Sequence, residues 1–224
     1  MIQDLENSIT DCAGMMEAIR QVGLLPLLEC GVRGFSADAL VAPNCRYRAT
    51  DDGWEWPLWQ WKGPLVTEGG FAYGKFFDGK AGFVTMDWWP DLCNWRRYKH
   101  PMPDEDSVEG AIREVLQESG SMVTRELRAA CGFTGPKMRS RFDAYVTRLQ
   151  MGCWVVTEDF VYPRDRHGNV YGWGWALLNT PERLFGRDAC RCSRTPDESR
   201  QRLLDQLRFL LPQATEKQLA KLIG

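Results

Sequence analysis

The residues with the clearest chemical potential lie between positions 54 and 98, where seven of the ten tryptophans gather among polar side chains. Aromatic faces can stack on an unpaired nucleobase, and polar groups beside them can recognise its edge. The alternative is ordinary core, since tryptophan buries a large area. The candidate aromatic pocket consists of Trp56, Trp59, Trp61, Tyr73, Lys75, Trp89 and Arg97.

Two polar residues of this segment, Glu55 and Gln60, are weak candidates for catalysis. A carboxylate could accept a proton from water, and an amide could orient that water. Neither residue has a spacing that identifies its role, so the catalytic residues stay open.

A second set of residues is cationic. Along a helical pattern, basic side chains form a stripe about a quarter turn from an apolar face, with the small Ala144 in the stripe. Arginine and lysine reach phosphates and guanine edges, whereas a merely solvated basic face is the alternative. The candidate DNA-binding residues are Lys137, Arg139, Arg141 and Arg148 on this helix, and Arg164, Arg166 and His167 in a turn that follows it.

The elements that would position these cations lie in residues 106–179. Asp106 and Glu109 form a capping-box pattern before a first helix that ends at Gly120, and Met122 with Val123 suits a short strand. A short helix with Thr124 as its N-cap, a third helix after Pro136 and two strands, 153–157 and 171–178, complete the pattern. This order is typical of a winged helix-turn-helix, whose third helix and wing contact DNA.

A hairpin is predicted at residues 72–84, because Asp78-Gly79 favours a two-residue type I′ turn. In the expected register Phe77 faces Lys80, Lys75 faces Gly82 and Gly74 faces Phe83. The fold class is therefore α+β, with a winged helix packed on an N-terminal helical and Trp-rich hairpin region and with C-terminal helices. The corresponding divisions are 1–103, 104–186 and 187–224, which we expect to form one compact body.

Composition limits the partners. The net charge is −2 and the pI about 5.8, so a site for double-stranded DNA must be a local patch; residues 136–168 carry only +2. The chain has no leader and no long apolar run, which predicts a cytoplasmic protein without membrane contact. The eight cysteines include no CxxC, so no metal site is expected. No cofactor is expected either. Leucines at 203–211 predict a helix that packs on the body or, alternatively, forms a homodimer.

Several stretches together resemble an uncharacterised bacterial family related to the winged-helix alkylpurine DNA glycosylases of the AlkZ type. They are "GLLPLLECGVRGFS", "GWEWPLWQWK", "AYGKFFDGKAGFV", "WWPDLCNWRR", "FDAYVTRLQMGCWVV" and "VYGWGWALLNTPERLFG". The resemblance implies a winged-helix fold, a bacterial cytoplasmic protein and a link to DNA repair.

This chain departs from those glycosylases in the residues that handle the attacking water. They are larger, with tandem winged helices, and use a Gln-x-Gln or Gln-x-Asp pair, which this sequence lacks. Gln60-Trp61-Lys62 could correspond to this pair, but a charged lysine cannot accept a proton from water. Glu55 is a conceivable carboxylate to take over that role.

Three hypotheses follow. The first is a DNA-binding winged-helix protein without catalytic activity. The second in rank is a module that binds a protein or small ligand and uses the winged helix as an interface; burial or ion pairing of Arg141 and Arg148 would favour it. The third is a base-excising glycosylase with a divergent active site.

Overall fold

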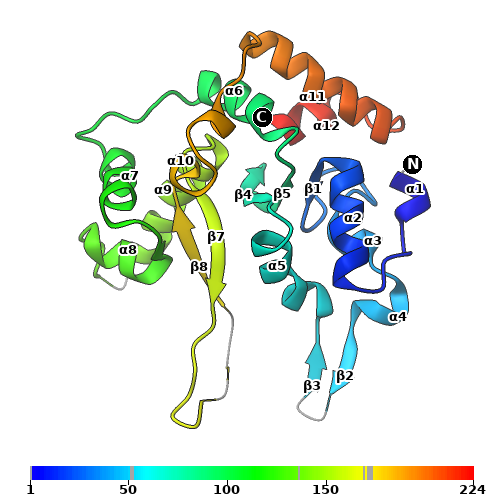
Figure 1. The fold of residues 1–224 in the computed structure, drawn as a ribbon, viewed down its shortest axis with the longest axis horizontal. Coiled ribbons are helices and arrows are strands. Elements are labelled where there is room, and N and C mark those ends of the chain that lie inside the picture. Colours follow the sequence, from blue (N-terminus) through cyan, green and yellow to red (C-terminus); the bar gives the residue numbers. More distant parts are fainter. Residues whose placement is uncertain (1, 51–52, 136, 169, 171–173) are drawn as a thin grey trace.

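The protein is an α+β structure in which one antiparallel sheet runs through the centre and helices lie around it (Figure 1). The computed structural model describes residues 2–50, 53–135, 137–168, 170 and 174–224. The α-helices among them are α1 Ile2–Leu5, α2 Cys12–Val22, α3 Ala37–Leu40, α4 Pro43–Arg46, α5 Pro57–Thr67, α6 Trp89–Lys99, α7 Val108–Ser119, α8 Thr124–Ala130, α9 Met138–Met151, α10 Pro181–Leu184, α11 Pro196–Leu210 and α12 Glu216–Ile223. A 3-10 helix, η1, spans Asp188–Cys190.

The sheet joins the two halves of the chain. Its order is β1-β5-β4-β7-β8-β6, and a separate two-stranded hairpin pairs β2 with β3. The strand pairings that the structure describes in these two sheets are all antiparallel. The strands are β1 Leu24–Pro26, β2 Arg48–Thr50, β3 Gly53–Glu55, β4 Ala72–Phe77, β5 Lys80–Val84, β6 Met122–Val123, β7 Val156–Val161 and β8 Trp175–Asn179.

Two hydrophobic cores lie along this sheet. The larger core combines side chains of the N-terminal half with those of α11 and α12, and includes Trp89 and Phe76 at its centre. The smaller core lies under α7, α8 and α9, around Ile112, Phe142 and Leu149. Tyr73 on β4 pairs with Thr157 on β7, so the sheet continues from one core to the other.

The hairpin of β4 and β5 has the predicted turn but not the whole predicted register. Asp78 and Gly79 have φ values of 51° and 74°, as a type I′ turn requires, and Phe77 faces Lys80 as expected. Beyond that pair a β-bulge shifts the strands, so Gly74 faces Gly82 and Tyr73 faces Phe83. The predicted pairs Lys75–Gly82 and Gly74–Phe83 are therefore wrong, because the bulge inserts an additional residue into β4.

The elements expected in residues 106–179 are present, with shifted boundaries. The N-cap of α7 is Ser107 and not Asp106: the Ser107 hydroxyl accepts a hydrogen bond from Gly110 N–H at 3.0 Å. The N-cap of α8 is Val123 and not Thr124, which lies inside the helix and donates its hydroxyl to Ala176 O at 3.1 Å. Strand β7 begins at Val156 rather than at 153, because Cys153 takes a left-handed turn with φ of 58°. Pro136 and residues 171–173 of the second predicted strand lie outside the described residues.

The C-terminal helices pack on the rest of the chain. Thr195 with Glu198 and Thr215 with Gln218 form complete capping boxes at α11 and α12. The leucines at 203, 204, 207, 210 and 211 are all buried within the chain. A homodimer through these helices stays a prediction, and it would have to use their outer faces, where Phe209 is exposed.

Helices α6 and α11 are joined by a buried carboxylate. Asp91 on α6 is only 1% exposed and accepts hydrogen bonds from Ser199 at 2.8 Å and from Arg194 at 3.3 Å. Arg202 forms a second ion pair with it. This network ties the C-terminal helices to the body, since a buried carboxylate needs charge partners and hydrogen bonds.

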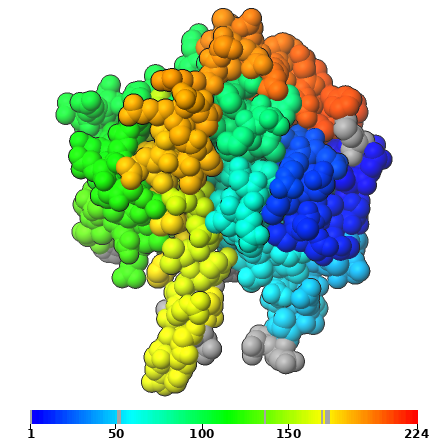
Figure 2. Space-filling view, in the orientation of Figure 1, coloured from blue at the N-terminus to red at the C-terminus, as the bar shows by residue number. Residues whose placement is uncertain are grey.

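Two hairpins project from the same side of the molecule (Figure 2). One continues from β7 and carries Arg164, Arg166 and His167, all exposed; Asn169 near its end lies outside the described residues. The other is the β2–β3 hairpin, with Trp54 exposed by 77%. Separately, no described helix combines the length and apolar character needed to cross a membrane.

Candidate nucleic-acid interface and the adjoining cavity

A cationic pocket, here called the arginine pocket, lies where α8, α9 and β8 meet. It has a volume of about 220 Å³. Its lining residues are Thr124, Arg125, Arg128, Arg139, Asp143 and Trp175. Three guanidinium groups stand against one carboxylate, so the pocket carries an excess of positive charge. Such a surface suits a phosphate, which guanidinium groups bind through charge-assisted hydrogen bonds.

A second cavity, the seam cavity, lies between the two cores and has a volume of about 270 Å³. It shares Thr124 and Asp143 with the arginine pocket, so the two hollows adjoin. Its walls come from β4, β5, β7, β8, α8 and α9. The lining residues are Tyr73, Gly74, Lys75, Ala81, Thr124, Asp143, Val146, Gln150, Thr157, Phe160, Ala176 and Leu178.

The polar side chains of the seam cavity hold one another in place. Gln150 accepts a hydrogen bond from Lys75 N–H at 3.3 Å and donates to Thr157 Oγ1 at 3.3 Å. Lys75 Nζ donates to Thr147 Oγ1 at 2.9 Å. Gln150 and Thr157 are almost fully buried, and this network therefore fixes the amide and hydroxyl groups that a ligand would meet.

The aromatic wall of the seam cavity leads to a buried lysine. Tyr73 and Phe160 meet edge to face with their ring centroids 5.6 Å apart. Burial raises the pKa of Tyr73, so this phenol stays protonated. The Phe160 ring also lies 3.9 Å from Lys62 Nζ, and the pKa of Lys62 is lowered to about 7 because burial disfavours its charged form.

The predicted cations of α9 are not equivalent. Lys137 and Arg141 are exposed, whereas Arg148 forms an ion pair with Glu109 in which its Nη2 lies 2.6 Å from Oε1. Arg139 lies 3.8 Å from Asp143. The arginine pocket thus brings together Arg139 with Arg125 and Arg128, and Arg148 lies elsewhere, beside a cavity lined by His100 and Trp154.

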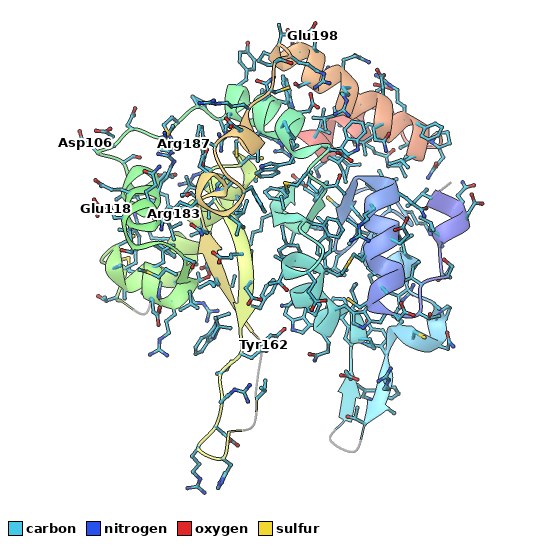
Figure 3. The ribbon with its side chains drawn as sticks, in the orientation of Figure 1. Asp106, Glu118, Tyr162, Arg183, Arg187 and Glu198 are labelled. Carbon is cyan, nitrogen blue, oxygen red and sulfur yellow. The ribbon has the colours of Figure 1, made fainter. Side chains whose placement is uncertain are left out.

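The cations of the projecting hairpin lie beyond Tyr162, which Figure 3 shows where the hairpin leaves the body. Arg164 donates to Gly168 O at 2.8 Å and Arg166 donates to His167 Nε2 at 3.0 Å. All three predicted side chains of this hairpin are exposed, so they remain accessible to a partner.

The predicted aromatic set does not form a single pocket. Only Tyr73 and Lys75 line the seam cavity. Trp56 stacks on Trp59 at 5.6 Å and donates its indole N–H to Asp38. Trp61 packs against the larger core, and Trp89 is fully buried inside it.

Arg97 also lies away from the seam cavity. Its guanidinium stacks over the Trp154 ring at 4.1 Å and forms an ion pair with Glu182 at 2.7 Å. It donates to Cys153 O at 2.8 Å as well. Arg97 therefore connects α6 with α10 and with the turn after α9.

The two weak catalytic candidates lie outside the seam cavity. Glu55 forms an ion pair with Arg48 at 3.7 Å on the β2–β3 hairpin, and Gln60 is exposed on α5. Sequence reasoning missed Arg125, Arg128 and Phe160 as wall residues. Arg125 and Arg128 lie at i and i+3 on one helix, a spacing that places both on one face and could have signalled them.

Among the described residues, no group of three or more His, Cys, Asp or Glu side chains is arranged to hold a metal ion. All eight cysteines are free thiols. Cys93, Cys153 and Cys190 are buried, and burial raises the pKa of Cys93 well above its ordinary value. These side chains contribute to the packing between α6, η1 and the turn that follows α9.

Comparison with known proteins adds one finding. The model of a family described as AlkZ related matches residues 9–224. Neither the curated proteins nor the solved structures contain a match to this chain. The family match covers nearly the whole sequence and includes the arginine pocket, the seam cavity and both projecting hairpins. The chain belongs to the AlkZ-related family.

Proposed function

We propose that this protein binds DNA, with residues 106–179 acting as a winged helix whose third helix is α9 and whose wing is the projecting β7–β8 hairpin. The observation that carries the proposal is the arginine pocket, which adjoins the seam cavity through Thr124 and Asp143. A phosphate in the pocket would place the neighbouring sugar or base next to that cavity. Membership of a family related to DNA glycosylases supports the same partner.

The charges of α9 and the wing support contact with the DNA backbone. Lys137, Arg141 and the wing cations are exposed, and the cations of the wing lie on an element that extends from the body. Phosphate contacts give affinity and register, whereas base contacts give specificity. Because the whole chain is slightly acidic, affinity would depend on these local groups and would fall steeply with salt.

A protein- or ligand-binding module remains the second candidate, and one observation favours it. Arg148, expected at the DNA interface, is paired with Glu109. Burial or ion pairing of Arg141 would also have favoured this candidate, but Arg141 is exposed on α9. The ion pair therefore removes one cation from the proposed interface and leaves its neighbours available.

Fluorescence anisotropy with a labelled duplex tests the proposal. The double variant Arg125→Ala/Arg139→Ala should weaken binding and reduce the salt dependence by about one unit of slope for each arginine–phosphate interaction that it removes. Arg33→Ala, which removes an exposed arginine from the loop before α3, is the matched control and should bind as the wild type does. Absence of binding at low salt, or equal weakening by the control, would refute DNA binding through the arginine pocket.

A further inference from the structure

Lys62 is an unusual lysine because its side chain is buried between aromatic rings. It is only 1% exposed. Its amine lies 3.1 Å from the centroid of Trp59 and 3.9 Å from that of Phe160. The described contacts of the amine are these two rings, and they include no carboxylate. Lysines are almost never buried without a charged partner, so this position needs an explanation beyond packing.

The surroundings keep much of this amine neutral. Burial is the cause that lowers the pKa of Lys62 from 10.5 to about 7. At pH 7 this leaves about a thousandfold more neutral amine than an exposed lysine has. Only the neutral form has the lone pair that attacks a carbonyl carbon, and desolvated lysines form Schiff bases for this reason.

The position of Lys62 connects it to the proposed DNA site. Phe160 contacts the amine and also lines the seam cavity, and its ring is only half-buried. The cavity adjoins the arginine pocket, where a phosphate would bind. Its volume of about 270 Å³ lies just below the range of roughly 300–1,000 Å³ that is usual for ligand pockets, which suits a single sugar rather than a whole nucleotide.

We propose that Lys62 is a nucleophile for the aldehyde carbon of an abasic deoxyribose in DNA. This inference rests on the proposed DNA-binding function and adds a substrate class to it. The abasic sugar would enter the seam cavity, and its C1′ carbon would reach the amine when the Phe160 ring turns aside.

The chemical step is a condensation. The nitrogen lone pair of Lys62 forms a bond to C1′, and the carbonyl π electrons move to oxygen, which takes up a proton. The resulting carbinolamine loses its hydroxyl group as water together with the second amine proton, which leaves an imine. Addition of water reverses the step and returns the aldehyde and the amine.

Reductive trapping tests this proposal on the full chain. A labelled duplex with one abasic site is incubated with the protein and sodium cyanoborohydride, which converts an imine into a stable secondary amine. We expect a covalent protein–DNA complex that falls by about tenfold or more in Lys62→Met, since methionine lacks the nucleophile. Lys80→Met, which removes an exposed lysine outside the cavity, is the control and should give the wild-type yield.

Peptide mapping of the wild-type complex keeps the test decisive if Lys62→Met does not fold. An adduct on Lys62 supports the proposal; an adduct on Lys75 or another lysine overturns it. Anisotropy on the same duplex separates the two proposals. Binding without a Lys62-dependent complex overturns only the nucleophile, whereas absence of both binding and trapping removes the DNA-binding function as well.

Discussion

Replacing Lys62 by methionine is expected to stabilise the protein at neutral pH. In the unfolded chain the amine keeps its ordinary pKa of 10.5, whereas the pKa in the folded protein is about 7. Folding at pH 7 therefore requires partial loss of a proton, which costs about 4 kcal/mol. Fitting the methionine side chain into the space that lysine occupies offsets up to about 1.5 kcal/mol of the gain from removing this cost.

The expected gain for Lys62→Met is thus about 2.5–4 kcal/mol in the free energy of unfolding at pH 7. Methionine has an unbranched apolar side chain of similar length, so it can occupy the same space without the desolvation cost. Urea denaturation of both proteins measures the difference directly, and fluorescence of the tryptophans reports the transition.

The pH dependence gives a second readout with a defined sign. Because the folded pKa is lowered, the cost of burial is fully present below about pH 7 and is relieved as the pH rises toward 10.5. Between these values wild-type stability should rise relative to the variant by about 1.4 kcal/mol per pH unit. Other titrating groups are common to both proteins and cancel in the comparison.

Two results would refute the reasoning. If Lys62→Met is less stable than the wild type at pH 7, the rings stabilise a charged amine by more than burial costs. If the difference between the two proteins is the same at pH 7 and pH 9, Lys62 does not titrate in this range. Either result also removes the chemical basis for a nucleophilic amine.

Further predictions concern the junction, the hairpin turn and the DNA interface. Asp91→Asn should lower the free energy of unfolding by about 1–3 kcal/mol, because the amide loses the ion pairs with Arg194 and Arg202, whose side chains stay partly exposed to water; a change within the error of urea denaturation would contradict this. In the same assay Gly79→Ala should lower the free energy of unfolding by about 1 kcal/mol, because Gly79 has a φ of +74°, a left-handed conformation that alanine adopts poorly. Gly79→Asn should lower it less, since asparagine tolerates this conformation; equal losses for the two variants would contradict the explanation. Glu109→Gln should free Arg148 and steepen the salt dependence of DNA binding by about one unit of slope, and an unchanged slope in anisotropy would place Arg148 outside the interface.

Local signals in the sequence predicted a large part of the fold. Asp78-Gly79 predicted its turn because both residues tolerate positive φ, and the leucines at 203–211 predicted a helix because their spacing is a local property of the chain. The β-bulge in β4 could not be predicted in this way. It depends on how β4 fits against two partners, β5 and β7, and the latter lies far along the chain.

The candidate site was harder to predict because burial is a tertiary property. Arg97 was expected in a pocket but is paired with Glu182, and Lys62 was expected to be charged but lies among rings with a pKa of about 7. Pro57 begins helix α5 within a run where tryptophans alternate with polar residues, so that the spacing alone did not show which rings share a face. The family resemblance was confirmed, since it depends on residues spread over nearly the whole chain.

The continuous sheet has a consequence for dividing this protein experimentally. In the intact chain the sheet ends at β1 and β6, which are only three and two residues long and offer little backbone to an intruding strand. Between the two halves, however, β4 and β7 are each six residues long. Expressing either half alone would break the pairing at Tyr73 and Thr157 and leave one of these strands as an edge with unpaired amide and carbonyl groups. Separate fragments should therefore aggregate, and co-expression of the two fragments should restore solubility by covering both edges.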